Sequence, residues 1–255
     1  MRLVVITQDD PFYVPVFFSR FLGALDLKQY QVQAIYVMRP FRESPSELVR
    51  RMYRFYGPVD FVRRGVQYAV RLAGDRLRLR AHSVRAIAKR YGIPVLEVSD
   101  VNSPTFARQV AAYDPDVILS VAAPQLFGEH LLRLPNWGCL NVHSAKLPQY
   151  RGMMPVFWAL YHGDRTVGVT VHRMDERLDR GDVLLQVEVP VCEGDSLDAV
   201  MTRCKEAAAD AVLAALSQIR DGTVTLRPVE GRGSYFSFPR PEHVRVLRQR
   251  GYRLL

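Results

Sequence analysis

The sequence has 255 residues, and its 48% hydrophobic and 24% charged content excludes a disordered or collagen-like chain. No apolar stretch approaches the ~20 residues of a membrane span, and the three scattered cysteines favour a reducing cytoplasm with neither a disulfide framework nor a metal site. The 35 basic and 26 acidic residues give a net charge of +9, which by itself supports nucleic-acid binding only weakly.

Short apolar or alternating segments, typical of strands, alternate with segments of helical periodicity along the chain. Strands are predicted at residues 3–7, 31–38, 95–98, 116–121, 138–143 and 168–174. Helices are predicted at residues 16–25, 104–113, 196–220 and 244–250, and a further helix ends at 158–162. This alternation predicts an α/β fold with a doubly wound, mostly parallel, Rossmann-like sheet.

Glycines and prolines punctuate the last part of the chain, which favours a division into two parts. We expect a catalytic domain over residues 1–225 and a short C-terminal extension over 226–255. Residues 234–239 alternate polar and aromatic side chains, as an edge strand does. Such a strand could cover the pocket or pair with a second subunit, so a homodimer is one expectation.

A concentrated basic segment lies between residues 50 and 90, where only Asp60 and Asp75 oppose the arginines and Lys89. Leu, Val and Ala alternate with the basic residues at helical spacing. This pattern predicts amphipathic helices with a solvated basic face. The alternative is a surface for a phosphate-bearing substrate.

The segment 139–152, CLNVHSAKLPQYRG, carries the first candidate for chemistry. Asn141 and His143 are two residues apart at the end of a predicted strand, so their side chains leave it on one face. Acyl transfer needs an amide that stabilises an oxyanion and an imidazole that moves a proton. Taken alone, the pattern is weak, because a histidine bonded to its neighbours in the core is the more frequent explanation.

The segment 168–182, GVTVHRMDERLDRGD, carries the second candidate. It places His172 on a strand and three aspartates, Asp175, Asp179 and Asp182, on the loop that follows. A carboxylate delivered to the first segment could orient His143 and keep it protonated. For each aspartate the alternative is turn formation or capping.

Together, N-V-H-S-x-x-L-P-x-x-R-G and G-V-T-V-H-x-M-D-x-x-L-D-x-G-D resemble the N10-formyltetrahydrofolate-dependent formyltransferase family. That family includes methionyl-tRNA formyltransferase, glycinamide ribonucleotide formyltransferase and the sugar N-formyltransferases. The resemblance implies catalytic roles for Asn141, His143 and Asp179, and direct transfer of a formyl group from N10-formyltetrahydrofolate to an amine. It also implies a folate site formed by residues 120–127 and the loop from 174, with contacts from Ala123, Gln125, Leu126, Phe127, Met174 and Leu178.

Departures from the family patterns bear on the acceptor. Residues 8–13, QDDPFY, replace the glycine-rich loop that holds phosphate in glycinamide ribonucleotide enzymes, and two carboxylates there would repel phosphate. The residues after 223 are too few for the β-barrel of full-length tRNA formyltransferases, whereas residues 151–160, RGMMPVFWAL, resemble sugar N-formyltransferases. We therefore expect a nucleotide-linked amino sugar, contacted by Gln8, Asp9, Phe12, Tyr13, Tyr150, Arg151 and Gly152.

Three alternatives remain from the sequence. One is a methionyl-tRNA formyltransferase-like enzyme without the barrel, and the second is a hydrolase that passes the formyl group to water. The third is a nucleic-acid-binding protein that uses the basic segment, whose affinity would fall steeply with salt and survive Asn141→Ala.

Overall fold

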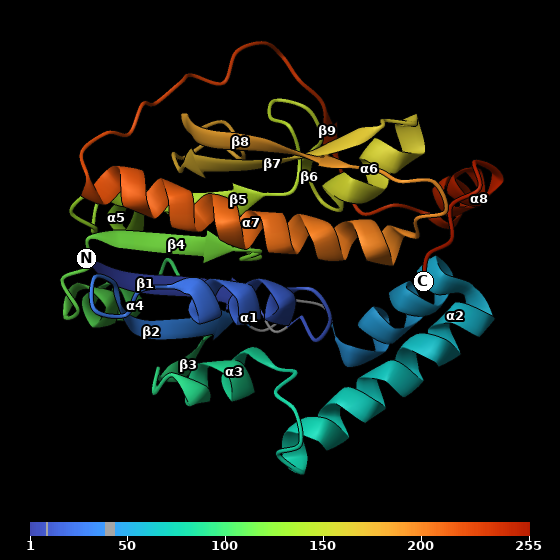
Figure 1. Ribbon diagram of the computed structural model, residues 1–255, viewed down its shortest axis with the longest axis horizontal. Coiled ribbons are helices and arrows are strands. Elements are labelled where there is room, and N and C mark those ends of the chain that lie inside the picture. The colour runs from blue at the N-terminus through green and yellow to red at the C-terminus, as the bar shows by residue number, and fades with distance from the viewer. Residues whose placement is uncertain (9, 39–43) are drawn as a thin grey trace.

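The computed structural model describes residues 1–8, 10–38 and 44–255, and a seven-stranded mixed sheet runs through it (Figure 1). The strand order is β3-β2-β1-β4-β5-β7-β8; β1 to β5 are parallel, and β7 and β8 continue the sheet antiparallel. The strands are β1 (Arg2–Gln8), β2 (Gln31–Met38), β3 (Val95–Val98), β4 (Val117–Val121), β5 (Gly138–His143), β7 (Thr166–Arg173) and β8 (Val183–Pro190). The predicted doubly wound, mostly parallel sheet is confirmed.

Helices cover both faces of this sheet. The helices of the described residues are α1 (Val14–Ala24), α2 (Pro45–Arg76), α3 (Val84–Arg90), α4 (Pro104–Ala111), α5 (Glu129–Leu132), α6 (Pro155–His162), α7 (Leu197–Arg220) and α8 (Pro241–Gln249); α2 extends away from the sheet (Figure 1). Alternate residues of β1 belong to two core clusters, since Leu3 and Val5 pack with α1 and α7, and Val4 and Ile6 pack with α4 and α5. Among the described helices none is long and apolar enough to cross a membrane.

The C-terminal residues pack onto the main sheet domain. β9 (Tyr235–Phe236) pairs with β6 (Arg151–Gly152) in a second, two-stranded sheet. The indole of Trp158 donates to the carbonyl of Ser237 at 3.0 Å and stacks on Phe236. The edge strand predicted over 234–239 is therefore short and lies against the segment that follows β5.

α2 differs from the prediction made for the basic segment. It bends at Gly57, whose φ of 74° lies in the left-handed region, and Pro58 begins its second half. In that second half Arg64 is buried, whereas Val62 and Val66 are exposed. The predicted basic face is thus solvated only in part there: Arg63 and Arg76 are exposed, whereas Arg64 is buried and attaches the helix to the body through an ion pair and hydrogen bonds.

Candidate functional site

Asn141, His143 and His172 project from one face of the sheet at the carboxyl ends of the parallel strands. In β5, Leu140 and Val142 pack into the larger core cluster, so the alternating Asn141 and His143 point to the other face. Asn141 is directly opposite His172 of β7 in the antiparallel register. This places an amide and two imidazoles side by side, in the position where ligands bind in open α/β sheets.

Asp179 joins these side chains from the loop between β7 and β8. Its Oδ1 lies 3.5 Å from Asn141 Nδ2, 3.9 Å from His143 Nδ1 and 3.8 Å from His172 Nε2. Its Oδ2 accepts a hydrogen bond from the Gly152 amide at 3.1 Å. The carboxylate is almost completely buried, so the structure brings Asn141, His143 and Asp179 together at one place.

His172 fixes the orientation of the Asn141 amide. Burial lowers the pKa of His172, so the ring is neutral near pH 7. Its Nδ1–H donates to the carbonyl of Arg173 at 3.2 Å, which leaves Nε2 to accept from Asn141 Nδ2 at 3.1 Å. The second Nδ2 hydrogen of Asn141 then points toward Asp179.

The segment after β5 folds back over His143. Its Nε2–H donates to the carbonyl of Tyr150 at 2.9 Å, so Nδ1 is the ring atom that faces Asp179. Gly152 has a φ of 92°, and an added Cβ would lie 2.4 Å from the Phe236 carbonyl oxygen. Only glycine fits between β9 and Asp179, which explains why its amide can reach the carboxylate.

Comparison with known proteins identifies the family. A formyl transferase family model matches residues 68–216, more than half of the chain. The chain belongs to the formyl transferase family. Methionyl-tRNA formyltransferase of Geobacillus thermodenitrificans is 36% identical over 157 residues, which cover 62% of this chain and 49% of the relative. The chain thus spans about half the length of the curated relatives it matches.

Solved structures of formyltransferases share the fold. A sugar N-formyltransferase from Shewanella sp. superposes with a TM-score of 0.59 at 17% identity, covering 93% of this chain and 76% of that chain. Glycinamide ribonucleotide transformylase 1 from Symbiobacterium toebii gives a TM-score of 0.60 at 19% identity, covering 90% of this chain and 94% of that chain. These likenesses show the architecture and leave the acceptor open.

Several residues expected to contact the folate follow β4, the strand that pairs with β5 beside Asn141, His143, His172 and Asp179, which we call the Asn141 cluster. Ser120 of β4 pairs with Asn141, so residues 122–127 leave the sheet next to the end of β5. Phe127 is buried in the smaller core cluster, and Ala123 and Met174 pack against it. The other three expected contacts differ in exposure: Leu126 and Leu178 are exposed, and the Gln125 side chain bonds the backbone of Ser99 and Val101.

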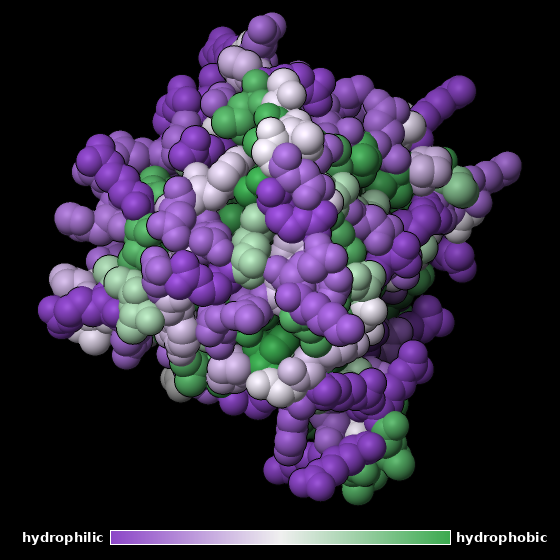
Figure 2. All heavy atoms as spheres, turned by 60° about the vertical axis from the view of Figure 1, so that its left-hand side comes forward, coloured by the Kyte–Doolittle hydropathy of each residue, from purple (hydrophilic) through white to green (hydrophobic). Residues whose placement is uncertain are grey.

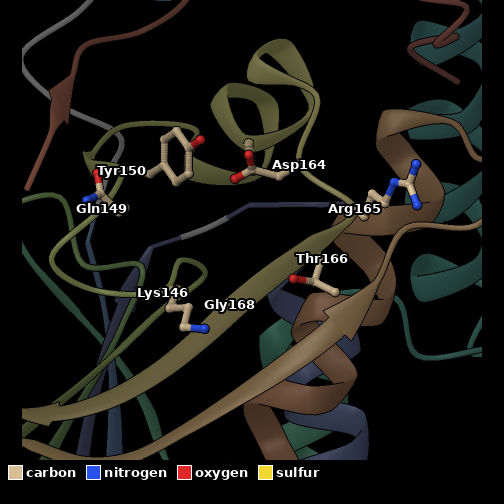
Figure 3. A pocket seen from close by; sticks show the side chains of 8 residues that line it. Lys146, Gln149, Tyr150, Asp164, Arg165, Thr166 and Gly168 are labelled. Carbon is tan, nitrogen blue, oxygen red and sulfur yellow. The ribbon is translucent and has the colours of Figure 1, made fainter.

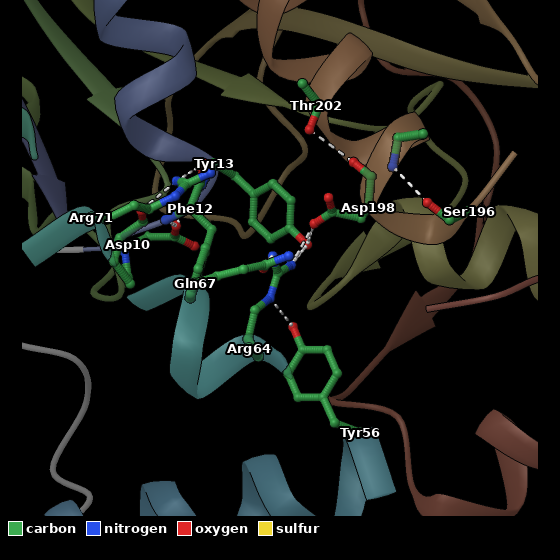
Figure 4. Close-up of polar contacts among 12 residues, drawn as sticks. Asp10, Phe12, Tyr13, Tyr56, Arg64, Gln67, Arg71, Ser196, Asp198 and Thr202 are labelled. Carbon is green, nitrogen blue, oxygen red and sulfur yellow. Dashed lines mark hydrogen bonds and ion pairs between the residues drawn. The ribbon is translucent and has the colours of Figure 1, made fainter. Parts of the chain in front are cut away.

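The residues expected at the substrate divide into two groups. Tyr150 and Gly152 contact the Asn141 cluster directly, as described above, and Arg151 is between them in β6. Phe12 and Tyr13 instead contact α2 and α7, where Arg64 lies over the Phe12 ring and bonds both the Tyr13 hydroxyl and Asp198 (Figure 4). The remaining two expected residues are Gln8, half-buried at the end of β1, and Asp9, which lies outside the described residues.

A surface cavity of ≈ 270 Å³ lies beyond the segment that covers His143 (Figure 3). Lys146, Gln149 and Tyr150 line it together with Asp164, Arg165 and Gly168, and Gly168 lies directly against Lys146. The backbone of Tyr150 binds His143 while its side chain lines this cavity. The cavity and the Asn141 cluster therefore share one loop.

The sequence predicts that His172 lies on a strand and indicates no role for it at the site. The alternating pattern of the segment before His172 indicates a strand that could pair with β5. To place His172 at the site one must also know the antiparallel register, which sets it opposite Asn141 rather than one residue away.

Proposed function

We propose that this protein transfers a formyl group from N10-formyltetrahydrofolate to an amino group of a nucleotide-linked amino sugar. The observation that carries this proposal is the convergence of Asn141, His143 and Asp179 on one face of the sheet, next to the ends of β4 and β5. Asp179 Oδ1 lies 3.5 Å from Asn141 Nδ2 and 3.9 Å from His143 Nδ1. Membership of the formyl transferase family, which uses a formyl-tetrahydrofolate donor, supports the same chemistry.

Each of the three side chains has a task that its position supports. The Nδ2 hydrogen of Asn141 that does not bond His172, and whose contact with Asp179 is long at 3.5 Å, would donate to the oxygen on which negative charge develops during acyl transfer. His143 turns Nδ1 toward the Asp179 carboxylate, at 3.9 Å, where the ring can move a proton. As the amine bonds the formyl carbon, Asp179 would accept the amine proton, directly or through water. The same proton would pass to the folate nitrogen that leaves as its bond to the formyl carbon breaks.

The residues around the cluster fit a folate donor, which supplies an activated formyl carbon when bound. Exposed Leu126 and Leu178 offer apolar surface to a flat ring. Residues 122–127 and the loop from Met174 to Asp179 would hold the donor.

The acceptor is inferred from the loop between β1 and α1. Asp10 Oδ1 accepts from the amides of Phe12 and Tyr13 at 2.7 Å each, at the start of α1. A carboxylate thus occupies the amides that would otherwise bind a phosphate. This disfavours a glycinamide ribonucleotide acceptor, and the stacked Tyr150 and Phe236 rings favour a sugar or base.

The test is formyl transfer from N10-formyltetrahydrofolate to a panel of dTDP- and UDP-linked amino sugars, followed by mass spectrometry. We expect one formyl group on an amino sugar and none in the absence of protein. Folate binding without turnover of any panel member would overturn the sugar assignment.

Methionyl-tRNA is the second candidate acceptor, because curated relatives that match 62% and 64% of this chain are methionyl-tRNA formyltransferases. Formylation of charged initiator tRNA in the same assay would favour it over the sugar. Release of formate in the absence of any amine would instead support hydrolysis of the donor.

A further inference from the structure

The second half of α2, from Pro58 onward, turns its polar side to the body of the protein. Arg64 bonds Gln67 at 2.9 Å and pairs with Asp198, and Arg71 donates to the Pro11 carbonyl at 2.7 Å (Figure 4). A surface helix normally buries its apolar side instead. The apolar side of this half-helix is therefore the one that faces solvent.

The solvent-facing side is broad and carries no charge. At about 100° per residue, positions 58, 59, 62, 65, 66, 69, 70, 72 and 73 lie within an arc of roughly 160°, centred opposite Arg64 and Arg71. All nine are Pro, Val, Gly, Ala or Leu. Eight large apolar residues in this arc, at its border or just after the helix are exposed by 47% to 77%; we call them the outer face: Val59, Val62, Val66, Tyr68, Val70, Leu72, Leu77 and Leu79. On a soluble monomer such residues are usually scattered singly, and a contiguous group marks an interaction surface.

Positive charge borders the outer face. Residues 58–80 contain six arginines and only two aspartates. Both aspartates are already bonded, since Asp60 pairs with Arg248 and Arg63 and Asp75 accepts from the His82 amide. Three exposed arginines alternate with the two leucines at the end of the face: Arg76, Arg78 and Arg80. The outer face therefore ends in a run of exposed positive charge.

The outer face lies at the margin of the molecule. In Figure 1 the second half of α2 runs along the lower right edge of the protein, and no described element lies beyond it. The lowest projection in Figure 2, at the height of the end of α2, exposes hydrophobic atoms beside hydrophilic ones. A flat surface can therefore contact the whole length of the face without meeting the sheet domain.

We infer that the outer face binds the surface of an anionic phospholipid membrane. The valine and leucine side chains enter the boundary between headgroups and acyl chains, and the exposed arginines bind the negatively charged headgroups. The arginine stems lie along the apolar layer while their guanidinium groups remain among the headgroups. The helix lies in the plane of the membrane surface and does not cross it.

Breadth and charge together determine this occupant. A partner helix packs on a narrow seam of apolar residues, whereas the arc of the outer face is much wider. A second copy of this chain would add further arginines rather than the negative charge that the end of the face attracts. An anionic bilayer complements both the apolar arc and the arginines.

The test is flotation of the full chain with vesicles of two compositions, phosphatidylcholine alone and equal parts of phosphatidylcholine and phosphatidylglycerol. We expect the protein to float with the anionic vesicles and to bind phosphatidylcholine at least ~10-fold more weakly. In about 1 M salt, binding to the anionic vesicles should weaken, because salt screens the arginines.

A charge placed within the arc should prevent insertion. Val62→Glu should weaken binding to the anionic vesicles by on the order of 10-fold or more. Val49→Glu is the matched control, since Val49 is a 55% exposed valine in the first half of the same helix and the change in net charge is the same. It should leave binding nearly unchanged.

The arginines at the end of the face should supply the preference for anionic lipid. Arg78→Gln combined with Arg80→Gln should weaken binding to the anionic vesicles by on the order of 10-fold. Arg108→Gln combined with Arg133→Gln removes the same charge from exposed positions of α4 and the end of α5, which cover the other face of the sheet. Equal losses in the two double variants would show that net charge, and not the outer face, causes binding.

Fluorescence reports insertion directly. Cys192 is the exposed cysteine, so the labelled variants also carry Cys192→Ser. A polarity-sensitive fluorophore on Val66→Cys should emit at shorter wavelength when the anionic vesicles are added, whereas the same label on Val49→Cys should not respond.

Two further outcomes would overturn the inference. One is a folded wild type, as judged by near-ultraviolet circular dichroism, that floats with neither composition. This includes the case in which it sediments as a dimer that Val62→Glu dissociates, since a second copy then covers the face. The other is flotation that Val62→Glu and Val49→Glu change equally.

Discussion

His172 lies directly across the β5–β7 ladder from Asn141, with its Nε2 3.1 Å from the amide nitrogen. Because burial keeps the ring neutral, His172 accepts a hydrogen bond there and orients the Asn141 amide toward Asp179. His172 is thus a positioning residue in the proposed chemistry. It acts on the substrate only through Asn141.

Removal of this orienting bond should slow turnover without loss of binding. We expect His172→Ala to lower kcat by about 10–100-fold, the effect of losing one buried hydrogen bond, with little change in KM for the folate. His172→Gln keeps an acceptor and should recover part of the rate. A parallel fall in kcat and folate affinity, without rescue, would point to a merely structural role.

The three converging side chains should carry most of the rate. His143→Ala should lower kcat/KM by ~10²–10⁴-fold and Asn141→Ala by ~10²–10³-fold. Asp179→Ala should abolish measurable turnover, and all three variants should remain folded. Asp182→Ala is the matched control, since Asp182 is exposed on the same loop outside the donor-binding segment. Equal losses in Asp182→Ala and Asp179→Ala would contradict the assignment.

The buried neutral His172 makes stability depend on pH. Its pKa is lowered below 6.5 in the folded protein, so between the folded value and 6.5 the unfolded chain binds more protons. The free energy of unfolding should therefore fall as the pH drops through 6.5. Urea denaturation at pH 7.5 and 5.5 measures this difference, which should shrink in His172→Gln; an undiminished difference would assign it to other groups.

The loop that carries Asp179 depends on Gly181. A Cβ at this position would lie 1.7 Å from the Arg173 carbonyl oxygen, which is backbone and cannot move aside. Gly181→Ala should lower the free energy of unfolding by about 3 kcal/mol or more. Gly65→Ala is the control: an added Cβ meets nothing within 4 Å on α2, so a gain of up to ~1 kcal/mol is expected. Thermal denaturation compares the two.

Arg64 should be the main anchor of the second half of α2. Replacing it with Met removes the ion pair with Asp198 and the hydrogen bond to the Tyr13 hydroxyl, and leaves only the 2.7 Å hydrogen bond from Tyr13 to Asp198. This should lower the free energy of unfolding by about 2–3 kcal/mol. Arg63→Met, at the solvent-exposed neighbouring position, should change it by no more than ~0.5 kcal/mol. Similar effects of both changes in urea denaturation would show that the buried network does not hold the helix.

Local patterns determined most of the sheet, and β2 occupies the residues predicted for it, 31–38. β8 was not predicted, although Val183 to Val189 contains an alternating stretch, because its pairing with β7 spans a long loop.

Asn141 and His143 were found from their spacing on one strand, which depends only on local geometry. Their approach to His172 depends on register between distant strands, which no local pattern contains.

The orientation of α2 could not be predicted for a related reason. Apolar residues at helical spacing normally mark the buried face of a helix. Val59, Val62 and Val66 have that spacing, so the sequence predicts that they are buried, but in the structure they are exposed. Which face is buried was decided by the ion pair between Arg64 and Asp198, residues 134 positions apart. Only the tertiary structure shows this pair.

The most direct test of the proposed chemistry is mass spectrometry of amino-sugar nucleotides incubated with N10-formyltetrahydrofolate and either wild type or Asn141→Ala. We predict that the wild type adds one formyl group to an amino sugar, and that Asn141→Ala binds the folate but adds the group at least ~10²-fold more slowly. A product formed equally fast by both proteins would contradict a role for the Asn141, His143 and Asp179 cluster in formyl transfer.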